Sequence, residues 1–160
     1  MSIAENLSKH FLDVHFGGNW TVSNLKDHLK DVTWQQSICQ VYHLNSIATL
    51  TYHSAYYVNV LIKVLEGGLL DGKDEDSFQV PPIQSEEDWE KIKLAVFENA
   101  KKAATLIATI SNEQLLEIFS DGKYGNYFRN ISGVIEHLHY HLGQIVLIKK
   151  IILQNENRNA

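Results

Sequence analysis

The chain has 160 residues, of which 44% are hydrophobic and 21% charged, and its formal net charge is -5. This length and composition are typical of one ordinary globular domain that buries a single core. Phosphate binding needs clustered Lys and Arg, so the acidic balance and the scattered basic residues argue against a nucleic-acid partner.

The sequence also lacks signals for a membrane or for secretion. Lys149 and Lys150 divide the richest apolar stretch, so no segment approaches membrane-spanning length. The first ten residues have no basic segment followed by an apolar run, so we expect no signal peptide. Cys39 is the single cysteine, and we expect a small buried residue there. These features predict a cytoplasmic protein without membrane contact.

Apolar residues recur with the 3.6-residue period of α-helices in the first half of the chain. A first long helix is expected from residue 2 to about 15, ending at Gly17-Gly18. A short helix should follow Thr21 or Ser23 and run through Leu29, and Thr33 should cap another through residue 39. Ser46 is a suitable N-cap for the second long helix, at residues 47–66.

The second half begins with a long polar connection over residues 67–85, which contains Pro81-Pro82. Ser85 then opens a third long helix to about residue 110, and Ser111 opens a short one. The last long helix should span residues 129–153. Residues 155–160 are expected to form a frayed tail.

Four long helices predict an all-α four-helix bundle, with residues 1–154 as a single domain. The connection between the second and third long helices has about 18 residues, enough to span a 20-residue helix of about 30 Å. It therefore allows these two helices to run parallel. We expect an up-down-down-up topology with a long crossover, rather than the simpler up-down-up-down form.

Two histidines, His137 and His141, lie one helical turn apart on the apolar stripe of the last long helix. A core position does not normally take two hydrogen-bonding rings side by side unless something satisfies them, and a divalent metal would do so. The intervening glutamate of the His-Glu-x-x-His motif is missing, which removes the metalloprotease interpretation.

A third histidine, His53, lies on the apolar stripe of the second long helix with Leu50, Tyr57 and Leu61. Three histidines from two facing helices and one open position would form a catalytic type of metal site. The alternative is a core histidine that bonds a backbone carbonyl or Tyr57. The other histidines lack such a context: we expect His139 at the surface and structural roles for His10, His15, His28 and His43.

Several motifs resemble the DinB/YfiT-like superfamily of bacterial metal-dependent bundle proteins, and the likeness covers nearly the whole chain. They are Asn-Ser-Ile-Ala at 45–48 followed by His53, Asp-Gly-Lys-Tyr-Gly-Asn-Tyr at 121–127, and His137-x-x-x-His141-x-Gly-Gln-Ile. Asn19-Trp20 and Leu-x-Asp-Val-Thr-Trp at 29–34 also belong to it. The resemblance implies that His53, His137 and His141 form the metal triad, with nickel or zinc as the ion. It also implies the up-down-down-up topology and a homodimer.

The resemblance does not imply a single reaction. Members include thiol S-transferases that use a low-molecular-weight thiol such as bacillithiol or mycothiol, and others are called hydrolases. A bound water or thiol is acidified by such an ion, and either would act on a small-molecule substrate. Gln144 and Tyr57 are candidates for the pocket, with simple core packing as the alternative for each. A non-catalytic dimeric stress-related bundle with a vestigial metal site is the alternative function.

Overall fold

A computed structural model describes residues 1–159, which form α-helices and one 3₁₀ helix without a β-strand. The protein is therefore all-α, as predicted. Four helices are long: α1 (Ile3–Phe16), α4 (Ile47–Leu65), α5 (Glu86–Ala108) and α7 (Tyr127–Asn159). The short elements are α2 (Leu25–Leu29), α3 (Trp34–Ile38), the 3₁₀ helix η1 (Asp74–Phe78) and α6 (Asn112–Leu116).

Most of the predicted helix starts are correct because capping side chains determine them. Ser46 and Ser85 accept hydrogen bonds from the backbone N–H groups of Thr49 and Asp88, and Thr33 forms a full capping box with Gln36. The predicted cap of α2 is wrong. Asn24 caps that helix, because the hydroxyl of Thr21 donates to Asn19 and the hydroxyl of Ser23 pairs with His28 instead.

The last helix is longer than predicted at both ends. It begins at Tyr127 and continues through Asn159, although residues 155–160 were expected to fray. A long-range contact holds this end, since the amide of Gln36 donates to both carboxylate oxygens of Glu156 at 3.1 and 2.9 Å. Ile152 is also buried in the core. Residue 160 lies outside the described part of the chain.

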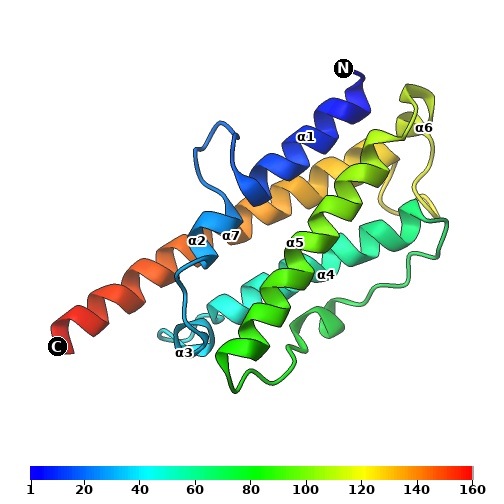
Figure 1. Ribbon diagram of the computed structural model, residues 1–160. Coiled ribbons are helices and arrows are strands. Elements are labelled where there is room, and N and C mark those ends of the chain that lie inside the picture. Colours follow the sequence, from blue (N-terminus) through cyan, green and yellow to red (C-terminus); the bar gives the residue numbers. More distant parts are fainter. Residues whose placement is uncertain (160) are drawn as a thin grey trace.

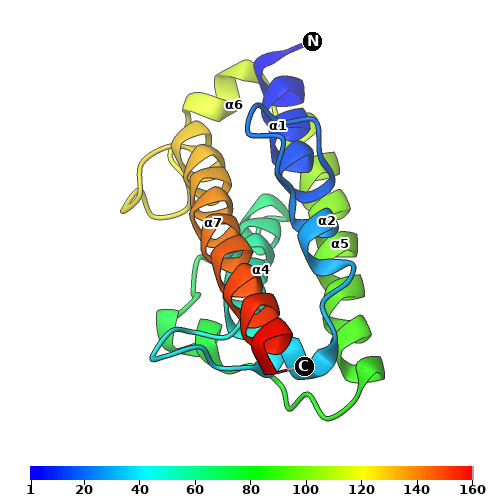
Figure 2. The same cartoon turned by 90° about the vertical axis from the view of Figure 1, so that its left-hand side faces the viewer.

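The long helices pack in neighbouring pairs. α1 contacts α5 and α7, and α4 contacts the same two helices. In both views α4 and α5 run from the end near α3 toward the end near α6, whereas α1 and α7 run the opposite way (Figures 1 and 2). The segment that joins α4 to α5, which contains η1, returns along the outside of these helices (Figure 1).

The buried apolar side chains of all four long helices join in one core. Its largest member is Trp89 on α5, which is fully buried and donates its indole N–H to the Val32 carbonyl at 2.9 Å. This bond ties the α2–α3 connection to α5. Among the described residues, no helix has both the length and the apolar character that crossing a membrane requires.

His15 on α1 lies inside this core rather than on a helix surface. Its ring is 1% exposed, and Nδ1 donates to the Phe11 carbonyl at 2.8 Å. Burial is the main cause that lowers the pKa of His15 from 6.5 to about 4, with the bond to the Phe11 carbonyl opposing it and the nearby His139 adding to it. Below pH 6.5 the unfolded chain therefore takes up a proton that the folded protein refuses, so stability falls as the pH drops toward 4.

This titration can be measured with the variant His15→Asn, whose amide N–H can still reach the Phe11 carbonyl. With a chelator present, we expect the wild type to lose about 2 kcal/mol more unfolding free energy than the variant between pH 7 and pH 5. Urea unfolding at the two pH values measures both losses. Equal losses would show that His15 does not titrate in this range.

Candidate metal centre

Three histidines from α4 and α7 meet between these two helices. The Nε2 atom of His137 lies 3.1 Å from Nε2 of His53 and 2.9 Å from Nε2 of His141. One ring nitrogen from each of the three lies within 4.8 Å of the others. The structure therefore brings the three predicted residues together, close enough to hold a metal ion.

The hydrogen bond of His53 Nδ1, the ring nitrogen that points away from the other two histidines, determines the tautomer of this ring. Nδ1 lies 2.7 Å from the hydroxyl of Ser77, and that hydroxyl donates its hydrogen to the backbone carbonyl of Asp74. The Ser77 oxygen can then only accept from the ring, so Nδ1 of His53 carries the proton. Nε2 is left with a lone pair that points toward the other two histidines.

The same argument applies to His141. Its Nδ1 lies 2.7 Å from Oε1 of Gln144, an amide oxygen that can only accept a hydrogen bond. Nδ1 therefore donates, and Nε2 again presents a lone pair to His137. Gln144, predicted as a pocket residue, orients a histidine from one turn away.

His137 is the member of the cluster without an outer partner, because its Nδ1 is buried and makes no hydrogen bond. A hydrogen on its Nε2 could not bond fully to both lone pairs that face it. A cation at the centre would satisfy all three nitrogens together. Nitrogens that share a tetrahedral zinc at 2.0–2.1 Å lie about 3.3 Å apart, so the two distances from Nε2 of His137 need to grow by only a few tenths of an ångström.

Burial keeps the rings of His137 and His53 in the neutral form that ligates metals. Burial lowers the pKa of His137 to about 4, with the charges of His141 and His53 adding to the effect and Asp74 opposing it. Burial also lowers the pKa of His53, again helped by His141. Near neutral pH each of these two rings therefore lacks the second proton that would compete with a metal.

Aromatic rings surround the cluster. Phe78 stacks on His53 with ring centroids 4.3 Å apart, and Tyr57 meets His53 and His137 edge-on at 5.2 and 4.9 Å. The Tyr57 hydroxyl donates to the Asp74 carboxylate at 2.6 Å. Burial and this bond raise the pKa of Tyr57 to about 12, so it stays protonated. Tyr57, the second predicted pocket residue, forms a wall of the centre.

Three residues of η1 contribute to the centre, and the sequence interpretation missed all of them. Asp74, Ser77 and Phe78 lie in the connection that we expected to be only a polar crossover. The run Asp-Glu-Asp-Ser-Phe at 74–78 has neither an apolar period nor a metal-ligand spacing. No local signal could have connected it to His53, which lies more than twenty residues earlier.

Another histidine lies outside the cluster. His139, expected at the surface, is half-buried and packs against His10 with ring centroids 5.8 Å apart. Its Nδ1 bonds the Ile135 carbonyl on its own helix. It takes no part in the cluster.

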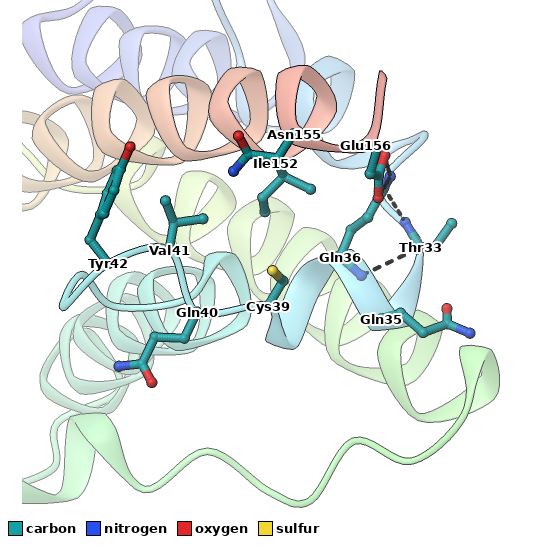
Figure 3. A pocket seen from close by; sticks show the side chains of 10 residues that line it. All are labelled: Thr33, Gln35, Gln36, Cys39, Gln40, Val41, Tyr42, Ile152, Asn155 and Glu156. Carbon is teal, nitrogen blue, oxygen red and sulfur yellow. Dashed lines mark hydrogen bonds between the residues drawn. The ribbon is translucent and has the colours of Figure 1, made fainter. Parts of the chain in front are cut away.

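The largest cavity described lies elsewhere, between the α3 region and the end of α7 (Figure 3). It has a volume of about 630 Å³, and none of the histidines lines it. Cys39 points into this groove and is exposed, so the expectation of a buried cysteine was wrong. Cys39 is the extended residue that ends α3, and its side chain lines the groove. Among the described residues, no group of three His, Cys, Asp or Glu side chains lies close enough together in this groove to hold a metal ion.

Comparison of the chain with protein-family models, with curated proteins and with solved structures found no match. The chemistry of the histidine cluster is therefore the basis for arguing function.

The hydrogen bond between Ser77 and His53 allows a test of the metal centre. Removing an outer partner of a metal-binding histidine typically weakens metal affinity 10- to 100-fold. We expect that loss for Ser77→Ala, measured as the dissociation constant for zinc or nickel by competition with a chromophoric chelator. The matched control is Ser54→Ala, a buried serine on α4 that bonds only the Leu50 carbonyl and should keep wild-type affinity.

Proposed function

We propose that the protein is a divalent-metal-dependent enzyme that acts on a small molecule, and that it is DinB/YfiT-like. One observation carries this proposal: three imidazole nitrogens converge in a buried place, and the partners of two of them direct their lone pairs inward. Without an ion, the one hydrogen that Nε2 of His137 can carry would have to serve both of the lone pairs that face it.

We propose that the four long helices form the up-down-down-up four-helix bundle. The common direction of α4 and α5 and the long return segment between them support this topology. The distribution of the histidines supports the family, since one lies on α4 and two on α7, as the resemblance implies. Following the same resemblance, we propose a homodimer and a cytoplasmic location.

The donor set favours nickel or zinc as the ion. Neutral imidazoles suit both metals, whereas magnesium and calcium prefer oxygen ligands. Within the described residues the cluster comprises three side chains, and a structural zinc site normally uses four. Three protein ligands are typical of a site that leaves a position for the substrate.

We favour a thiol S-transferase over a hydrolase. When bound, a divalent ion acidifies a thiol or a water molecule that it coordinates. A free thiol has a pKa of about 8.5 and water one of 15.7, so a thiol needs far less help from a general base. Among the described carboxylates, Asp74 is the one that bonds a wall residue of the centre, and it already accepts the Tyr57 hydroxyl.

The chain supplies position and shielding to that reaction. A thiol R–SH and an electrophile R′–X give the thioether R–S–R′ and HX, so no external oxidant or reductant is needed. Gln144 and Ser77 hold two rings in the ligating tautomer, and Phe78 and Tyr57 keep water away from one side. If the protein binds metal and turns over neither kind of substrate, the non-catalytic dimer with a vestigial site is the correct interpretation.

Metal binding can be tested on protein purified without a His tag. Zinc or nickel at 100 times its dissociation constant should stabilise the wild type by about 2.7 kcal/mol, because a ligand bound only to the folded state raises stability. His137→Ala should lose this gain, and it should still fold because the substitution removes an unsatisfied buried nitrogen. Thermal unfolding with and without each metal is the measurement.

The control is His139→Ala, which removes a histidine from the same helix but not from the cluster. It should keep the full stabilisation by metal. A wild type that gains nothing from any divalent ion, and that contains none when freshly isolated, would rule out both enzymatic interpretations.

The reaction can be tested with metal-loaded protein, an aryl halide electrophile and a panel of low-molecular-weight thiols. We expect electrophile consumption that depends on the thiol, on the metal and on His137. The rate is followed by the absorbance of the thioether product. Thiol-independent cleavage of an activated ester, with no thioether formation, would identify a hydrolase instead.

A further inference from the structure

We infer that a cavity beside the histidine cluster holds the body of the substrate, and that this body is apolar or aromatic. The substrate class is then a small molecule in which a metal-binding head group is joined to an apolar body. This inference rests on the proposed function and adds the part of the substrate that the metal does not contact.

The cavity lies on the same helix stripes as the histidines. Along α4, Tyr57 and Leu61 follow His53 at successive turns, and both line the cavity. Along α7, Val134 precedes His137 by one turn and also lines it. At 1.5 Å per residue, the step from His53 to Tyr57 is about 6 Å along the axis. The cavity therefore begins about one helical turn from the histidine cluster.

Tyr57 connects the two places directly. Its ring lines the cavity, and the same ring meets His53 and His137 edge-on. Its hydroxyl donates to the carboxylate of Asp74, a residue of the crossover segment that also lines the cavity. A ligand that extends from the centre into the cavity must therefore pass over the face or the edge of this ring.

The polar groups of the cavity are largely occupied by other protein groups. The Asn130 amide donates to the carbonyls of Tyr124 and Asn126, and the Asp121 carboxylate accepts the backbone N–H of Lys123. The Lys123 ammonium lies over the Tyr124 ring, 5.0 Å from its centroid.

The surface that remains for a ligand is mostly apolar and aromatic. It is contributed by α4, α7, the crossover and the α6–α7 connection, through Val60, Leu61, Leu70, Phe119, Tyr124 and Val134. The cavity volume of about 350 Å³ is at the low end for small-molecule sites, which limits the body to a short chain or a single ring.

The experiment uses zinc- or nickel-loaded protein and a series of hydroxamates, in which the head group binds the metal and the tail varies. Affinity should rise about fourfold for each methylene added from acetohydroxamate to hexanohydroxamate, as expected for burying apolar groups. Benzohydroxamate should also bind more tightly than acetohydroxamate. Isothermal titration calorimetry gives each dissociation constant without relying on turnover.

Val134→Phe fills the cavity from α7 and should remove the gain from the tail, while acetohydroxamate and the metal bind as in the wild type. The matched control is Val146→Phe, because Val146 is also a half-buried valine of α7 packed on the core but does not line this cavity. Leu70→Phe fills the same cavity from the crossover segment, and it serves if Val134→Phe does not fold.

The outcomes separate the inference from the proposed function. If acetohydroxamate binds the loaded protein but longer tails add nothing, or if the two valine variants lose the gain equally, the cavity does not hold the body and the inference is wrong. In that case the metal centre stands. If neither zinc nor nickel binds, the proposed function fails, and the inference fails with it.

Discussion

The main constraint on this protein is that three ring nitrogens face one another and have few other groups to bond. His53, His137 and His141 occupy positions that the helical period assigns to core residues, yet each is a polar ring. Leaving a buried acceptor unsatisfied costs roughly 1–3 kcal/mol. Three such rings at one point therefore need partners, and they lie close enough together to share a metal ion.

The crossover between α4 and α5 does more than connect two helices that run in the same direction. It forms η1 against α4, and there it places the Ser77 hydroxyl on Nδ1 of His53 and the Phe78 ring on its face. It also fixes Tyr57 through the Asp74 carboxylate. The segment that joins α4 to α5 therefore also determines the tautomer of His53. Metal binding and the order of this segment should be linked, since each holds His53 in the same state.

The sequence predicted what depends on local periodicity and capping. Ser46 and Ser85 begin their helices as expected, and the three histidines converge because the 3.6-residue period alone assigns them to inward faces. It could not predict contacts made across the fold. Gln36 on α3 bonds Glu156 near the end of α7, 120 residues away, and Ser77 bonds His53 from an aperiodic run.

The apolar stripe of a helix predicts which residues are buried, but it does not predict which parts of the fold pack against them. Tyr57, Leu61 and Val134 follow the same period as their core neighbours, so the sequence could not distinguish a packed position from a cavity wall. The difference depends on which parts of the fold cover each position, and those contacts leave no mark on the local period. Where the crossover and the α6–α7 connection cover α4 and α7, a cavity remains, and the period of these helices could not predict it.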